Sequence, residues 1–232
     1  MNCGQSHLIP LPPAGDESQT TRLADELALA IHLGRMSPGQ PLREVELAEA
    51  HNVSRTIVRA ALQRLEAQGL AEITLNKGAR VRRPDADAVD DLIELHVQLA
   101  TLAARNAAWR ATAEQISRIE DFVRMMEHLA EEMSPPEEFQ HLRIGFARAL
   151  HNAAGPVLAE RLRTAAPATP YHERAMDDLR SRDGRQEAAR AARDVLRAIE
   201  SKQAEAAAAA AERMLRRHAE RTLTRRAAKT LV

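Results

Sequence analysis

The chain has 232 residues, of which 44% are hydrophobic and 28% are charged, as expected for a globular protein of one large or two small domains. Basic and acidic residues each number 33, so the net charge excludes no class of partner. Aromatic residues make up only 2%, so the core must consist mainly of Leu, Ala, Val and Ile, which favours close-packed helices.

The beginning of the chain carries no targeting or membrane signal. It lacks the basic end and the apolar stretch of a signal peptide, and no apolar run approaches the roughly 20 residues of a membrane span. The single cysteine, Cys3, excludes an intramolecular disulfide and fits a reducing compartment. We therefore expect a cytoplasmic protein with no membrane partner, whose residues 1–16 form a flexible leader.

Residues 17–83 predict a small domain that contains a helix, a tight turn and a second helix. A first helix runs from a cap at Thr20 or Thr21 to about Leu33 and precedes a turn at residues 37–40. A short helix then covers residues 44–51, and Asn52 suits the left-handed turn position that follows. Ser54 caps the next helix, which ends near Gly69.

A β-hairpin follows these helices. Residues 71–74 and 79–82 are short β-compatible runs, and the turn between them, residues 76–78, ends in Gly78, which tolerates a positive φ. The order of helix, turn, helix and hairpin predicts a winged helix-turn-helix in which the hairpin is the wing. Residues 84–86 form the linker to the rest of the chain.

The remaining residues, 87–232, predict an all-α bundle of six or seven helices, which makes the fold class mainly α. Pro and Gly clusters separate helices expected near residues 86–110, 113–132, 136–152, 156–165, 171–181, 185–201 and 203–226. The alanine-rich tract 204–211 is expected inside the last helix, because alanine is the strongest helix former.

The start of the third helix predicts a surface that reads DNA. Arg55 and Arg59 lie four residues apart and therefore point the same way, opposite an apolar stripe. An arginine can bind guanine with two hydrogen bonds, and the hydroxyls of Ser54 and Thr56 suit phosphate oxygens. At the wing tip, Lys77 and Gly78 would enter a minor groove or follow the backbone. The alternative is an ordinary solvated arginine face.

Residues 42–70, LREVELAEAHNVSRTIVRAALQRLEAQGL, and the wing NKGARVRRP resemble the DNA-binding domain of the GntR family of bacterial transcription regulators. The resemblance implies that Ser54, Arg55, Thr56 and Arg59 contact operator DNA, together with the wing around Gly78. Some positions depart from the family pattern. Val45 stands where some relatives carry a DNA-contacting arginine, and Arg43 is its nearest substitute.

The C-terminal part resembles the FadR subgroup of that family, most clearly in GFARALHNAAGPVLAERL and LRAIESKQAEAAAAAAERMLRRH. The resemblance implies a helical domain that dimerises and encloses an effector cavity, in many members with a metal ion. At the family's metal positions this chain has Arg143, Ala147, Ala192 and Met214, so we expect no metal cofactor. A divalent ion held by His96, His151 and His218 is the disfavoured alternative.

The expected effector pocket contains His96, Arg143, Ala147, His151 and His218. Arg143 would pair with an anionic ligand or a buried acid, and the small residues Ala100, Ala147 and Ala192 would leave room for a less polar one. The expected small-molecule effector is therefore an organic acid or a less polar metabolite.

We accordingly expect a homodimeric transcription regulator that binds double-stranded operator DNA and is a repressor released by its effector, because a twofold dimer reads two half-sites. The alternative is a DNA-binding regulator or architectural protein with a degenerate, effector-independent C-terminal domain. An enzyme is not expected, because the sequence has no phosphate-binding loop, nucleophile elbow or HExxH motif.

Overall fold

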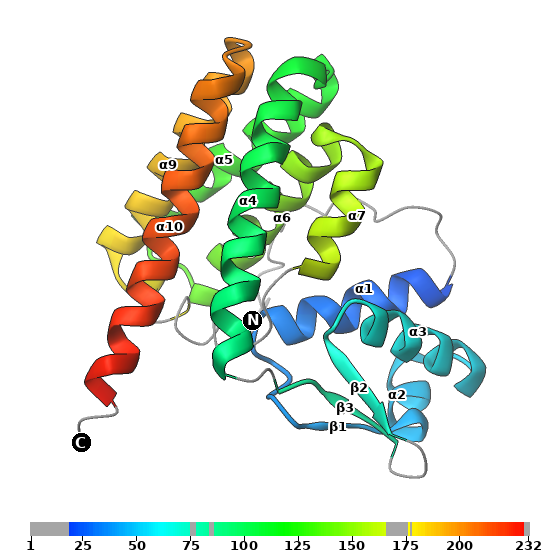
Figure 1. The fold of residues 1–232 in the computed structure, drawn as a ribbon. Coiled ribbons are helices and arrows are strands. Elements are labelled where there is room, and N and C mark those ends of the chain that lie inside the picture. The colour runs from blue at the N-terminus through cyan, green and yellow to red at the C-terminus, as the bar shows by residue number, and fades with distance from the viewer. Residues whose placement is uncertain (1–18, 75–77, 84–85, 166–175, 177, 230–232) are drawn as a thin grey trace, which may run out of the picture. The chain divides into compact units, whose positions relative to one another are not determined.

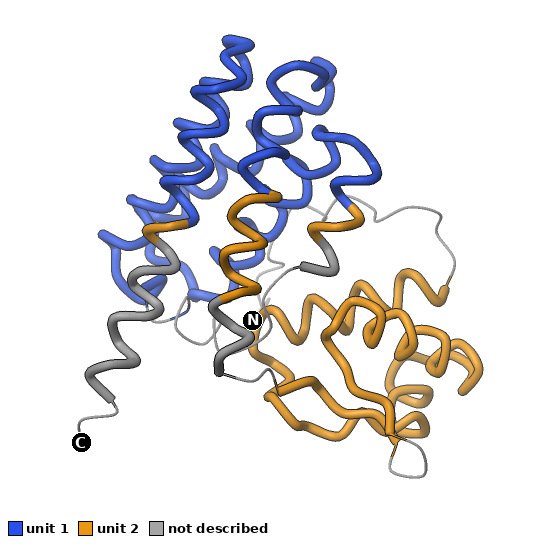
Figure 2. Tube along the Cα trace, viewed as in Figure 1, with its two compact units in different colours: residues 1–12, 100–159, 176–215 blue, residues 13–99, 160–175, 216–232 orange. Residues whose placement is uncertain are grey.

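The computed structural model describes residues 19–74, 78–83, 86–165, 176 and 178–229 (Figure 1). Within this part of the chain lie nine helices and one three-stranded antiparallel sheet, which confirms the predicted, mainly α fold class. The chain divides into two compact units (Figure 2): unit 1 comprises residues 1–12, 100–159 and 176–215, and unit 2 comprises residues 13–99, 160–175 and 216–232.

Unit 2 contains the predicted helix-turn-helix and its sheet. Its elements are α1 (Gln19–His32), β1 (Pro41–Leu42), α2 (Glu44–His51), α3 (Arg55–Ala67), β2 (Ala71–Thr74) and β3 (Gly78–Val81). Helix α1 packs against α3, and α3 packs against α2 and β2. Their apolar faces share one core, whose members include Leu27, Ile31, Leu62, Leu65 and Val81, each at most 2% exposed.

Two details of unit 2 correct the sequence-based expectations. The prediction that Thr20 or Thr21 caps the first helix is wrong, because α1 already includes Gln19 and both threonines. Thr21 is buried, and its hydroxyl oxygen accepts a hydrogen bond from Nη1 of Arg64 at 2.5 Å. The wing also has a third strand that was not predicted. Strand β1 pairs with β3 so that Pro41 lies opposite Arg80, and the strand order is β1-β3-β2.

The helices of the C-terminal part follow the predicted order. They are α4 (Ala86–Arg110), α5 (Ala113–Glu132), α6 (Pro136–Ala154), α7 (Pro156–Ala165), α9 (Arg182–Glu200) and α10 (Ala204–Lys229). Helices α4 and α10 each contribute residues to both units. The helix expected at 171–181 falls largely on residues outside the described ones. No helix in the described part of the chain is long and apolar enough to cross a membrane.

The core of unit 1 is built largely from alanine, with Leu, Ile, Val, Met and Phe side chains between the alanines. Helix α5 packs against α6 and α9, and the three phenylalanines of the sequence, Phe122, Phe139 and Phe146, are all buried there. Alanines of α4, α9 and α10 complete this core, including Ala104, Ala192 and Ala207. Small side chains allow close helix packing, which explains how a chain with few aromatic residues forms a continuous apolar interior.

One charged side chain, Arg185, is also buried in unit 1, with 1% of its surface exposed. Its Nε donates to the carbonyl oxygen of Leu179 at 2.5 Å, and its Nη1 donates to that of Leu129 at 3.4 Å. Its guanidinium carbon lies 5.7 Å from the ring centre of Phe139. Burial lowers the pKa of Arg185, and the nearby carboxylates of Glu137 and Glu138 oppose this effect. The cation therefore ties the end of α5 to the start of α9.

A close contact of a glycine in unit 1 predicts an unusual response to substitution. Gly145 of α6 lies against the ring of Phe122, and a Cβ atom at this position would overlap that ring. Gly145→Ala usually stabilises a helix by about 1 kcal/mol. Here we expect it to lower the free energy of unfolding by about 1–3 kcal/mol, because the core is overpacked. Denaturant unfolding of the full chain measures this change.

A double variant provides the control. Adding Phe122→Leu should relieve the overlap, so the combined loss is expected to be smaller than the sum of the two single losses. Additive losses, or a Gly145→Ala variant more stable than the wild type, would show that the ring does not limit the space at Gly145.

Candidate nucleic-acid interface

Helix α3 presents the predicted DNA-reading residues because its opposite face is buried. Its apolar stripe, which consists of Val58, Ala61, Leu62 and Leu65, is at most 2% exposed. Successive residues of a helix turn by about 100°, so the start of the other face points to solvent. Ser54, Arg55, Thr56 and Arg59 are all exposed there, as the sequence predicts.

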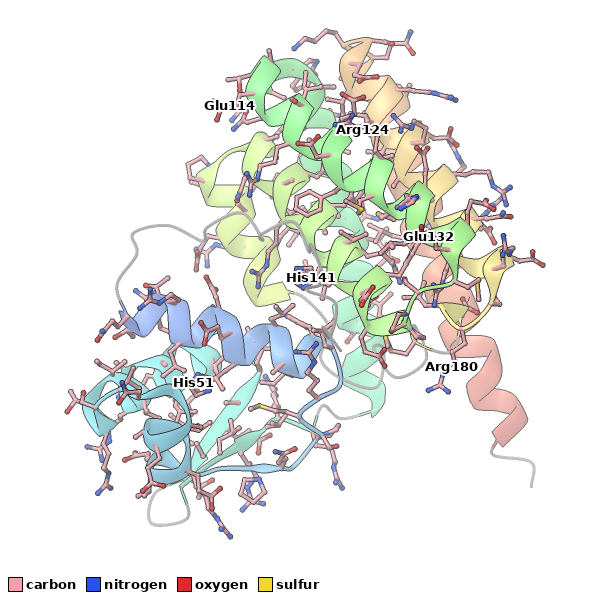
Figure 3. All side chains as sticks on the ribbon, turned by 180° about the vertical axis from the view of Figure 1, so that it is seen from behind. His51, Glu114, Arg124, Glu132, His141 and Arg180 are labelled. Atoms are coloured by element: carbon pink, nitrogen blue, oxygen red, sulfur yellow. The ribbon has the colours of Figure 1, made fainter. Side chains whose placement is uncertain are left out.

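The turn and the cap before α3 have the predicted geometry. Asn52 adopts a left-handed conformation, with φ 51° and ψ 49°, and ends α2. The hydroxyl oxygen of Ser54 then accepts a hydrogen bond from the backbone nitrogen of Ile57 at 3.3 Å. This side-chain cap satisfies an otherwise unpaired amide in the first turn and fixes where α3 begins. His51, labelled in Figure 3, lies at the end of α2, and its Nδ1 is 3.2 Å from Oε2 of Glu26 in α1.

Both predicted arginines bind one carboxylate, that of Glu44 in the first turn of α2. Arg59 makes two hydrogen bonds to it, from Nε to Oε1 at 3.0 Å and from Nη2 to Oε2 at 2.9 Å. Nη2 of Arg55 reaches Oε2 at 3.5 Å. The arginine side chains are 64% and 61% exposed, for Arg55 and Arg59, whereas that of Glu44 is 27% exposed. Both guanidinium groups thus remain accessible although they share an acid.

This arrangement favours the charged forms of Glu44 and Arg59. The hydrogen bond from Arg59 lowers the pKa of Glu44, with further lowering from Arg55. The same bond to Glu44 raises the pKa of Arg59. Glu44 is also at the N-terminus of α2, where the helix dipole favours a negative charge. The site therefore carries two cations and one anion throughout the physiological pH range.

Glu44 was not among the site residues predicted from the sequence. It lies 11 residues before Arg55 and 15 before Arg59, so no local helical spacing links them. The one available signal was an acidic residue at the first position of α2, which is common because of the helix dipole and therefore not specific. The contact depends on the angle between α2 and α3, which the sequence pattern does not define.

The remaining candidates of this interface lie around α2 and the wing. Arg43 precedes α2, is exposed, and donates from Nη1 to Oε1 of Glu46 at 2.7 Å. Val45, where some relatives carry an arginine, is 49% exposed. Gly78 has φ +79° and open space around the position of a Cβ atom, which fits a wing tip that approaches DNA closely. Lys77 lies outside the described residues.

Three residues of the predicted effector pocket lie on one helix. Arg143, Ala147 and His151 are half-buried and lie at four-residue intervals on α6, hence on one helix face. Nη1 of Arg143 donates to Oε1 of Gln140 at 3.3 Å. His96 lies on α4, and His218 lies on α10 where the side chain is outside the described part.

The residues at the family's metal positions do not fit a metal ion. Arg143 brings a positive charge, and Ala147 and Ala192 have no ligand atom. Among the described residues, no group of three or more His, Cys, Asp or Glu side chains is placed to hold a metal. The three-histidine alternative includes His218 and stays a prediction.

Comparison with known families gives two matches along the chain. Residues 19–81 match the family described as bacterial regulatory proteins, gntR family, and residues 90–217 match the FCD domain. The second match alone covers more than half of the chain.

Curated relatives carry the names of transcription regulators. The chain is 39% identical over 111 residues to the Nta operon transcriptional regulator of Aminobacter aminovorans. The aligned region covers 46% of this chain and 53% of that protein. It is 33% identical over 88 residues to a D-xylose utilization operon transcriptional repressor of Paenarthrobacter nicotinovorans. This aligned region covers 38% of the chain and 39% of that repressor. The chain thus spans about half the length, or less, of these relatives.

Solved structures share the fold over nearly the whole chain. E. coli McbR/YncC superimposes with a TM-score of 0.74 at 18% identity and covers 90% of this chain and 99% of its own. A GntR transcriptional regulator from Rhodococcus sp. RHA1 gives a TM-score of 0.67 at 24% identity, with 88% and 98% covered. At these identities the likeness establishes the architecture.

His96 provides a pH test of the C-terminal helices. Burial lowers its pKa from 6.5 to about 4. Between these values the unfolded chain takes up a proton that the folded chain does not. The free energy of unfolding is therefore expected to fall as the pH decreases from 6.5 to 4, by up to about 3 kcal/mol. Denaturant unfolding of the wild type and of His96→Gln at several pH values measures this contribution, which the variant should lack.

The control for this test is His128→Gln, which removes an exposed histidine of α5. This variant keeps His96, so its free energy of unfolding should still fall between pH 6.5 and pH 4. An equally steep pH dependence in His96→Gln would show that His96 is accessible to protons in the folded chain.

Proposed function

The chain belongs to the gntR family of bacterial regulatory proteins and carries an FCD domain, and from this premise we propose that it is a sequence-specific, DNA-binding transcription regulator. The observation that carries the proposal is the pair of exposed guanidinium groups at the start of α3. A recognition helix needs such donors in its first turns while its other face packs on the domain. Its relatives are named as regulators, and no enzymatic activity is proposed.

We assign the base-reading role to Arg55 and Arg59 and phosphate contacts to Ser54, Thr56 and Arg43. Two hydrogen bonds from an arginine to O6 and N7 of guanine are the commonest specific contact in the major groove. The wing around Lys77 and Gly78 contacts the adjacent backbone or minor groove in this proposal. The protein acts in the cytoplasm as a repressor of the genes whose operator it binds.

The C-terminal domain is proposed to bind a small-molecule effector that releases the repressor from DNA. The FCD match supports the domain type, and the half-buried Arg143 supports an anionic group such as the carboxylate of an organic acid. A less polar metabolite is the second class, and no metal is assigned. The alternative is a DNA-binding regulator or architectural protein whose C-terminal domain binds no effector. Its affinity for the operator would not change with any metabolite, which distinguishes it from the proposed repressor.

We propose that two chains associate through α4. Three large apolar side chains are exposed at seven-residue intervals along this helix: Leu95 at 49%, Leu102 at 40% and Trp109 at 63%. Trp109 is the only tryptophan of the sequence. A seven-residue interval keeps these side chains on one face, as in helices that pair with another helix. Two bidentate ion pairs hold α10 beside α4: Arg216 donates to Glu94, and Arg105 donates to Glu205.

The DNA-reading proposal is tested by removing one guanidinium group at a time. Arg55→Ala and Arg59→Ala should each lower the preference for operator over random duplex by about tenfold or more, because each removes contacts to bases. Fluorescence anisotropy at one fixed salt concentration measures both affinities, on an operator selected by the wild-type chain from a random duplex pool.

The matched control is Arg64→Gln, which removes the same charge from the same helix. Arg64 donates to Thr21 of α1, so it belongs to a different face of α3. Its variant should keep the preference of the wild type. An unchanged preference in both the Arg55 and Arg59 variants would refute the assignment of base readout to these residues.

The dimer proposal predicts that Leu102→Asp separates the two chains. The residue is already 40% exposed, so the substitution should leave the fold intact while placing a charge in the interface. Light scattering after size exclusion should give the mass of one chain for the variant and of two for the wild type. Val157→Asp, at a residue 76% exposed on α7, is the control and should remain dimeric. A dimeric Leu102→Asp protein would exclude α4 as the interface.

A further inference from the structure

Glu44 controls which edge of Arg59 is available to a ligand. A guanidinium group has five N–H bonds, which form two edges suited to two parallel hydrogen bonds. In this structure the carboxylate of Glu44 occupies the edge formed by Nε and Nη2. Nη1 of Arg59 has no hydrogen-bond partner within the described residues, and the side chain is 61% exposed. The edge formed by Nη1 and Nη2 is therefore the one that faces outward.

The position of Glu44 is itself fixed by the fold. It is the first residue of α2, which packs against α3, and the buried Leu47 one turn later anchors this helix in the core. The carboxylate reaches Arg55 as well, so it lies between the two arginines on the surface that they share. A long arginine side chain otherwise samples many rotamers, and the entropy lost on binding would lower its selectivity.

We propose that Glu44 is the positioning residue for base readout: it holds Arg59 by its Nε edge so that the terminal edge meets a guanine in the major groove. This inference rests on the proposed function and deepens it, since it assigns selectivity to an acidic residue that carries no charge attraction to DNA. The carboxylate weakens the attraction to phosphates, because it cancels one positive charge close to the duplex. Glu44 thus lowers the affinity for any duplex and raises the selectivity between base pairs.

Two variants of Glu44 separate geometry from charge. Glu44→Gln removes the anion, and Glu44→Asp keeps it but shortens the side chain so that the two-bond pair with Arg59 is lost. Both should lower the ratio of operator to random-duplex affinity by about tenfold. Only Glu44→Gln should also bind random duplex more tightly than the wild type, because it alone changes the charge.

Glu49→Gln is the matched control. Glu49 lies on the same helix and is exposed, and its replacement removes the same charge without touching either arginine. It should keep the affinity ratio of the wild type. Replacing each G·C pair of the selected half-site in turn adds a position-specific readout. Replacing one particular G·C pair should lower the affinity of the wild type but leave the affinity of the Glu44 variants unchanged.

The outcomes distinguish this inference from the proposed function. A wild-type chain that selects no sequence from the random pool refutes both. A selective wild-type chain whose Glu44→Gln variant keeps its ratio refutes the inference alone. A Glu44→Gln variant that binds operator more tightly with an unchanged ratio also refutes it, since Glu44 would then act as a general electrostatic brake. Thermal unfolding of each variant shows whether the domain remains folded.

Discussion

Four apolar side chains of α3, Val58, Ala61, Leu62 and Leu65, bury one side of this helix against the core of unit 2. Their burial determines where every residue on the other side points, because a helix is rigid over two or three turns. The cap at Ser54 fixes where α3 begins, and Arg55 is the first residue after this cap. In the proposed function, recognition of DNA thus depends on apolar packing on the opposite side of the helix from the arginines.

The same rigidity explains why a single acid can serve two arginines. Glu44 extends from α2, and the left-handed Asn52 sets the turn between α2 and α3. With both helices packed on one core, the carboxylate is held in reach of both guanidinium groups at 2.9–3.5 Å. Exposed ion pairs contribute little to stability, because water screens them. The value of this contact therefore lies in orientation rather than in the free energy of unfolding.

The sequence predicted the features that depend on local periodicity and missed those that depend on the angle between elements. The helix order, the αL turn at Asn52 and the buried stripe of α3 follow from spacing and capping, and they are confirmed. Strand β1 is only two residues long and has no alternation to detect. The Glu44 contact joins residues 11 and 15 positions apart, and the exposure of Leu102 depends on which α4 face the other helices cover. Such contacts need the tertiary arrangement.

The surface of α3 and the core of unit 1 are built from different kinds of side chain. The proposed DNA-reading surface consists of long charged side chains whose freedom is reduced by one ion-pair partner. The helical core of unit 1 consists of small side chains, with the ring of Phe122 packed against Gly145, so it tolerates little change in volume. Helices α4 and α10 each contribute residues to both units.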